Sequence, residues 1–165
     1  MSRTGRIVRE GMTTGFIGYA AVAVFYAIVD TLAARGPFFT LDLLGKAVFR
    51  GVRDPALLFL PMEPDLVGML AYNFLHLTVA LGVGLLVAYL VAAVEERPAT
   101  AYPVLTVLLA GYLVTIATVG LLGQELLPLL PWWSIVVVNT LAAICAGAYL
   151  LRAHPGLLRR AREAS

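Results

Sequence analysis

Four long apolar stretches constrain this chain more than any other feature of its sequence. They cover about residues 12–34, 66–94, 102–122 and 132–151. A helix rises about 1.5 Å per residue and the hydrocarbon core of a bilayer is about 30 Å thick, so about 20 apolar residues cross it. Each stretch has that length or nearly so, and the pattern predicts four transmembrane helices.

The composition agrees with a membrane protein. The chain is 61% hydrophobic and 13% charged, and a soluble domain of 165 residues could not keep so much apolar surface away from water. We therefore expect an all-α integral membrane four-helix bundle that forms a single transmembrane domain over residues 1–165, with the lipid bilayer as its surroundings.

The basic residues predict the orientation of the helices. If both termini are cytoplasmic, the two ends and the second loop hold eight Lys and Arg residues, and the first and third loops hold four. Cytoplasmic loops carry an excess of such residues. The count predicts a multi-pass protein of the bacterial inner (plasma) membrane with both termini in the cytoplasm.

The first loop is expected to contain a short amphipathic helix at about residues 41–52, with Thr40 as its N-cap. Charged side chains lie three or four residues apart on one face: Asp42, Lys46, Arg50 and Arg53. Apolar side chains lie on another: Leu41, Leu44, Val48 and Val52. This pattern is typical of a helix on the membrane surface, or of one packed over the mouth of the bundle.

Two ionisable residues lie inside the apolar stretches, Asp30 and His76. Such residues are rare and costly within a span, so each is a candidate functional residue. Asp30 is about 6 Å from the outer end of its stretch at the helical rise, and His76 has the same depth if its helix enters the hydrocarbon near Tyr72. We expect one polar cluster in the outer half of the bilayer, made of Asp30, His76, Asn73, Asn139 and Tyr26.

This cluster has several interpretations. It is typical of hydrogen bonding between helices, at about 0.5–2 kcal/mol per contact. A carboxylate and an imidazole could instead exchange protons with a quinone-type ligand. A haem with His76 as its one axial ligand is a further alternative, as are a solute pathway and a lipid pocket.

The chain has no sequence motif of a catalytic site. No P-loop, dinucleotide-binding glycine pattern, zinc-ligand spacing or nucleophile elbow occurs, and no basic and aromatic array of a nucleic-acid interface is present. We therefore expect neither an enzyme nor a resident cofactor or metal.

Several segments resemble uncharacterised small bacterial four-helix inner-membrane proteins. The resemblance lies in Asn73-Phe74-Leu75-His76-Leu77, in the glycines at 11, 15, 18, 82 and 84, and in residues 139–141 and 150–155. It implies a bacterial membrane and four spans, and it supplies no activity.

The sequence favours a non-enzymatic accessory or structural subunit of a larger membrane complex. Four apolar helices without a soluble domain leave most side chains facing lipid or another protein. The alternative is a small carrier, or a proton- or quinone-linked binding protein, that uses the polar cluster.

Overall fold

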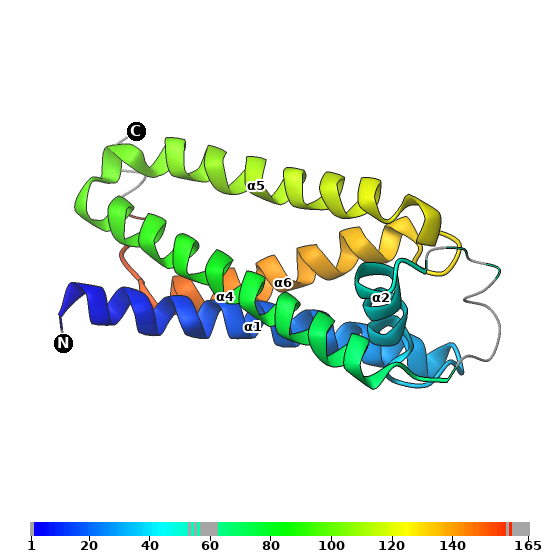
Figure 1. Cartoon of the computed structure of the whole chain (residues 1–165). Helices are drawn as coiled ribbons and strands as arrows, with labels where there is room; N and C mark the ends of the chain where they lie inside the picture. Colours follow the sequence, from blue (N-terminus) through cyan, green and yellow to red (C-terminus); the bar gives the residue numbers. More distant parts are fainter. Residues whose placement is uncertain (1, 53, 55, 57–62, 158, 160–165) are drawn as a thin grey trace.

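The structure is a computed structural model that describes residues 2–52, 54, 56, 63–157 and 159. The described part of the chain is all-α (Figure 1). Its long helices are α1 (Arg3–Leu32), α4 (Leu66–Glu96), α5 (Ala101–Leu122) and α6 (Trp132–Ala153). Three short helices connect them: α2 (Phe39–Phe49), η1 (Pro98–Thr100) and η2 (Gln124–Leu126).

The four long helices are the predicted membrane spans. Each contains an 18-residue window whose mean hydropathy is between 1.8 and 2.5, and each has at least 22 residues, so each can cross the hydrocarbon core. The chain is therefore an integral membrane protein with four spans. The helices extend beyond several of the apolar stretches, most clearly at α1, which begins at Arg3 rather than at Met12.

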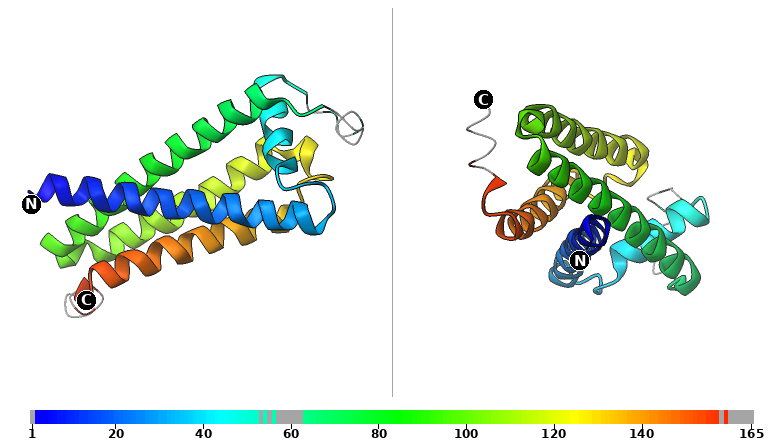
Figure 2. Two further views of the ribbon diagram at one scale, coloured as in Figure 1. Left: turned by 90° about the horizontal axis from the view of Figure 1, so that it is seen from below. Right: turned by 90° about the vertical axis from the view of Figure 1, so that its left-hand side faces the viewer.

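Helix α1 is the central element of the bundle. It packs along α4 and α6, whereas α5 makes far fewer contacts with its neighbours. The end-on view shows α5 at the side of the other three spans (Figure 2). Because the number of spans is even, the N-terminus and the C-terminal end of α6 lie at the same end of the bundle, here termed the terminal end (Figure 1). The opposite end is termed the loop end.

Helices α1 and α4 cross at a contact made by glycines. A Cβ atom built on Gly84 would lie 2.3 Å from the carbonyl oxygen of Gly11 and 2.3 Å from the backbone nitrogen of Gly15. A Cβ on Gly15 would lie 2.5 Å from the carbonyl oxygen of Ala80. The two backbones thus touch without intervening side chains, as small residues allow between helices in a membrane.

Helix α2 lies across the loop end and packs over the mouth of the bundle, one of the two arrangements expected for it (Figure 1). Its buried Leu43 and Ala47 form a small apolar core with Leu126 and Leu129 from the connection between α5 and α6. A Cβ on Gly45 would lie 2.6 Å from the backbone carbon of Gly68, so α2 also touches the start of α4.

The prediction that Thr40 is the N-cap of this helix is wrong. Helix α2 begins at Phe39, and its N-cap residue, Phe38, makes no side-chain capping bond. Thr40 lies inside the first turn, where its backbone N–H donates to the carboxylate of Asp30 at 2.7 Å. A side chain of α1 thus performs the capping that the local sequence pattern had assigned to Thr40.

The glycine crossing predicts a large difference between two similar substitutions. Gly84→Ala should lower the free energy of unfolding by about 1–3 kcal/mol, because its methyl group has no space between α1 and α4. Gly82→Ala should change it little, since a Cβ at Gly82 meets nothing within 4 Å. Unfolding by increasing fractions of denaturing detergent measures both. Equal stabilities of the two variants would contradict the backbone contact.

Candidate functional site

The polar side chains on the buried faces of the spans lie at three levels of the bundle. One group is at the loop end around Asp30, one is in the middle around His76, and one is at the terminal end around His154. The first two contain three of the predicted residues: Asp30, His76 and Asn73. The third was not predicted.

Asp30 is fully buried at the loop end of α1. Its carboxylate accepts hydrogen bonds from the backbone N–H of Thr40 at 2.7 Å, from the Thr40 hydroxyl at 2.9 Å and from Arg35 at 3.2 Å. A buried carboxylate needs a positive partner and hydrogen bonds to offset its desolvation. Asp30 has both, and they attach α2 to the end of α1.

Arg35 extends this contact to the other loop at the same end. Its guanidinium donates to the carbonyl oxygen of Leu129 at 3.1 Å and lies 4.5 Å from the ring centroid of Phe39. Arg35 and Asp30 therefore join the connection between α1 and α2 to the connection between α5 and α6.

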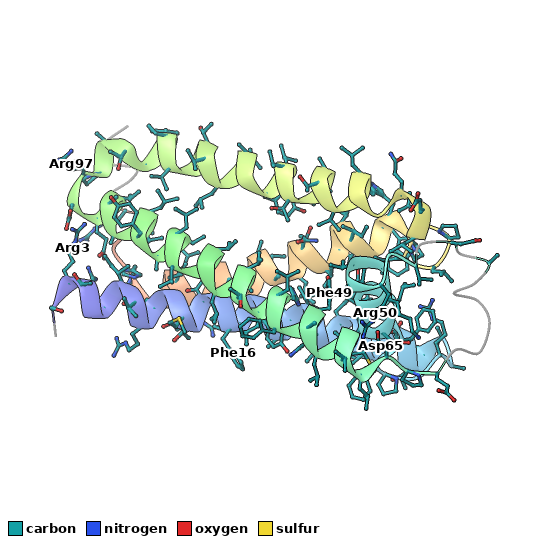
Figure 3. The ribbon with its side chains drawn as sticks, in the orientation of Figure 1. Arg3, Phe16, Phe49, Arg50, Asp65 and Arg97 are labelled. Carbon is teal, nitrogen blue, oxygen red and sulfur yellow. The ribbon has the colours of Figure 1, made fainter. Side chains whose placement is uncertain are left out.

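A second ion pair fixes the start of α4 against α2. Asp65 is the N-cap of α4 and accepts from the N–H of Gly68 at 3.0 Å, while Arg50 donates to it at 2.6 Å. Figure 3 shows Arg50 and Asp65 side by side at the loop end, far from Arg3. The hydrogen bonds from Arg50 and then from Gly68 lower the pKa of Asp65 to about 2. The same pair raises the pKa of Arg50.

In the middle of the bundle, His76 lies between two tyrosine rings. Its ring centroid is 5.3 Å from that of Tyr19 on α1 and 6.2 Å from that of Tyr72, one turn earlier on α4. The Tyr19 hydroxyl donates to Asn73 at 2.7 Å. Within the described part of the chain, the imidazole nitrogens of His76 make no hydrogen bond, and the contacts here are between α1 and α4.

The other two predicted residues have separate partners. Tyr26 on α1 lies 3.4 Å from the hydroxyl oxygen of Ser134 on α6. Asn139 donates to the carbonyl oxygen of Ile135, one turn earlier in its own helix, at 2.7 Å. Tyr26 thus joins two spans, whereas the described bond of Asn139 stays within α6.

The expected polar cluster is therefore divided into separate contacts. The structure brings His76 and Asn73 together beside Tyr19. Asp30 lies with Thr40 and Arg35 instead, and among the described residues it shares no hydrogen bond or ion pair with His76. The depth estimate did not predict this separation, because it considered only the position of each residue along the membrane normal and not the position of α2. A ligand at any of these residues stays a prediction.

The terminal end holds a buried group that sequence reasoning missed. His154 is 4% exposed and lies between two carboxylates: its Nε2 is 3.1 Å from Glu10, and its Nδ1 is 2.7 Å from Glu95. Arg6 pairs with Glu95 at 2.9 Å, and nearer the surface Arg3 contacts Glu96 at 2.6 Å. These contacts join α1, α4 and α6.

A signal for this group was present in the sequence. An even number of spans places Glu10, Glu95 and His154 at the same end, each at the edge of an apolar stretch. The sequence alone does not show which side chains face inward, so it did not predict that these three meet. Across the residues that the structure describes, no set of three His, Cys, Asp or Glu side chains is arranged to hold a metal ion.

A cavity of about 440 Å³ lies between α5 and the start of α6. It is lined by apolar side chains and one amide: Leu113, Ile116, Ala117, Gly120, Leu121, Gln124, Leu127 and Trp132. At this level the ring of Trp132 on α6 packs directly against Gly120 of α5.

Comparison of the chain with protein-family models, with curated proteins and with solved structures finds no match. The assignment as a four-span membrane protein therefore depends on the helices themselves, and no family is identified.

The buried Asp30 predicts a strong effect of its removal. Asp30→Ala should lower the free energy of unfolding by about 3 kcal/mol, because the partly buried guanidinium of Arg35 and the first turn of α2 lose their acceptor. Asp30→Asn should cost less, since its amide oxygen still accepts from Thr40. Asp54→Ala is the control, because Asp54 is exposed and its described bond is to Ala56 in its own loop. Denaturation in detergent measures all three, and an Asp30→Ala variant as stable as the control would contradict the capping role.

The ion pair of Asp65 predicts a dependence of stability on pH. Because the pKa of Asp65 is about 2 in the folded protein and about 3.9 in an unfolded chain, the pair stabilises the fold above about pH 4. This contribution is lost as the pH falls from about 4 towards about 2. Thermal unfolding of the wild type and of Asp65→Asn over this range tests it. The two should converge at the acidic end, and a constant difference would contradict the prediction.

Proposed function

We propose that this protein is a non-enzymatic accessory or structural subunit of a larger membrane complex, and that α5 is the span that contacts the partner. The observation that carries the proposal is that few residues of α5 are buried inside the molecule. In its apolar 18-residue window 6% of residues are buried, compared with 11% in α1, 28% in α4 and 22% in α6. Helix α5 also differs from α1 in having far fewer contacts with the other spans.

A span that packs so little on its own protein has its surface available to other membrane proteins. Apolar burial does not drive helices together in lipid, so association depends on close packing and on polar contacts. Helices α1, α4 and α6 have such contacts with each other, as the glycine crossing and the His154 group show. The large apolar side chains of α5 are exposed on several sides, among them Leu105, Val107, Leu109, Leu113 and Val114.

The proposal includes the orientation that the basic residues favour. We place the protein in a bacterial inner membrane with the terminal end in the cytoplasm, because the two ends and the second loop hold eight of the twelve Lys and Arg residues. Reporter fusions at the C-terminus that are active only in the cytoplasm or only outside it test this placement.

The subunit proposal predicts a defined assembly. Native mass spectrometry after gentle extraction from the protein's own membrane should show this chain in a larger complex of fixed composition. A photoreactive amino acid at Leu109 of α5 should then form crosslinks to that partner. The control position is Phe16 of α1, which has the same exposed fraction of 57% and should crosslink to lipid. A lone protein, or equal crosslinking at both positions, would contradict the proposal.

A second function is favoured by the surroundings of His76. Its half-buried imidazole lies between two tyrosine rings and has both nitrogens available, an arrangement suited to a flat, proton-linked ligand of the quinone type. If His76 serves as such a site, His76→Ala should abolish ligand binding and leave assembly intact. A Soret band in the purified protein would indicate haem instead.

A further inference from the structure

The imidazole of His154 joins three spans at the terminal end of the bundle. Its side chain is 2% exposed, and its two nitrogens lie within hydrogen-bonding distance of two different carboxylates, Glu10 on α1 and Glu95 on α4. His154 follows the last residue of α6 and is the C-cap of that helix. Each of the three groups thus comes from a different span.

The two hydrogen bonds set the number of protons in this group. A neutral imidazole has one N–H hydrogen that it can donate, and an ionised carboxylate has no hydrogen to donate. Two bonds among His154, Glu10 and Glu95 therefore need two hydrogens, either as an imidazolium between two carboxylates or as a neutral imidazole beside one protonated carboxyl group. With the charge of Arg6, which pairs with Glu95, both arrangements are electrically neutral. Loss of one proton leaves a net negative charge in a buried place.

We propose that Glu10, His154 and Glu95 form a proton-binding site that holds the terminal ends of α1, α4 and α6 together while it contains two protons, and that loss of one of these protons releases α6 from α4. The ligand is the proton itself. It leaves to water past Glu95, the most exposed of the three side chains at 20%.

The charges around the site determine which bond is lost. The side chain of Glu10 is 8% exposed, and its described partner is His154. Glu95 is also paired with Arg6. The remaining hydrogen is best placed towards Glu10, because that charge has the least access to water and to other cations. The lone pair of Nδ1 then faces an oxygen of Glu95 and repels it.

The other described charged side chains at the terminal end are exposed, among them Arg9, Arg97 and Arg159. Arg3 and Glu96 form a pair whose side chains are about half exposed, and such surface pairs contribute little. Arg152, two residues before His154 on α6, is exposed. Direct contact between α4 and α6 is slight, so the bond between His154 and Glu95 is the main link between their ends.

The test measures the distance between these ends as the pH changes. Spin labels are placed on cysteines at Ala99, just after α4, and at Ala153 on α6, both exposed, in a chain with the single native cysteine replaced (Cys145→Ala). The distance is measured in the full-length protein in lipid nanodiscs from about pH 5 to about pH 10, and it should shift to longer values in one single-proton step when the proton is lost. A constant distance over this range would overturn the proposal.

One substitution should abolish the change of distance with pH and keep the terminal ends of α4 and α6 together. In Glu10→Gln the amide donates to Nε2 while the single ring hydrogen goes to Glu95, so both bonds form with a neutral imidazole. This variant should stay at the short distance at high pH. Glu96→Gln is the matched control: it makes the same change one residue from Glu95, on a side chain paired with exposed Arg3, and should keep the step. A step that survives in Glu10→Gln would overturn the proposal.

The two histidines of the chain provide a further control. His154→Gln should remove the dependence on pH, whereas His76→Gln should retain it. In the His76→Gln protein, ¹⁵N spectra report on the His154 ring alone, and the change in its protonation should coincide with the change in label distance. A step that persists in His154→Gln, or a ring that titrates while the distance stays constant, would show that the site does not control the contact.

Discussion

The close contact of α1 with α4 at Gly11, Gly15 and Gly84 is the interaction on which the rest of the structure depends. Lipid tails are as apolar as the side chains of the spans, so apolar burial gives the helices little reason to associate. Backbones that touch gain dispersion contacts over a long surface and bring polar side chains of the two helices within hydrogen-bonding distance. Tyr19 reaches Asn73 only because the crossing places the two helices this close together.

The two ends of α1 carry the polar contacts that orient the other helices. Glu10 and Asp30 are both buried, and at the helical rise their separation of twenty residues is about 30 Å, which is the thickness of the hydrocarbon core. A hydrocarbon core between these two residues would leave each carboxylate near an edge of the membrane, where its partners can be charged without crossing the apolar region. Glu10 binds His154 and thereby connects α1 to α6, and Asp30 binds Thr40 and Arg35 and thereby connects α1 to α2. Helix α1 is central because its two ends and its middle all contact other helices.

The spans could be predicted from the sequence, and the pairs that hold them could not. Length and apolar content decide whether a helix can cross a bilayer, and both are local properties, so the four spans and the short helix in the first loop are confirmed. The approach of Glu10 to His154 joins residues 144 positions apart and depends on the rotation of two helices about their axes, which length and hydropathy do not determine. The prediction of the N-cap of α2 failed for a related reason. Thr40 matched the local sequence pattern of an N-cap, but the carboxylate that accepts from the first turn of α2 comes from Asp30 on another helix.

Helix α5 has fewer specific contacts with its own protein than the other spans have, and this difference bears on function. It has neither an ion pair with another span nor a glycine contact with a neighbouring backbone among the described residues, and one hydrogen bond, between Tyr112 and Thr140, joins it to α6. Trp132 covers Gly120 near the cavity at the loop end, so even there the contact is a side chain on a backbone. A span with so few specific contacts gains nothing by staying close to its own bundle once another surface offers better packing. The internal polar groups of this protein hold three helices in place, and under the proposed subunit role the fourth is the helix that a partner would contact.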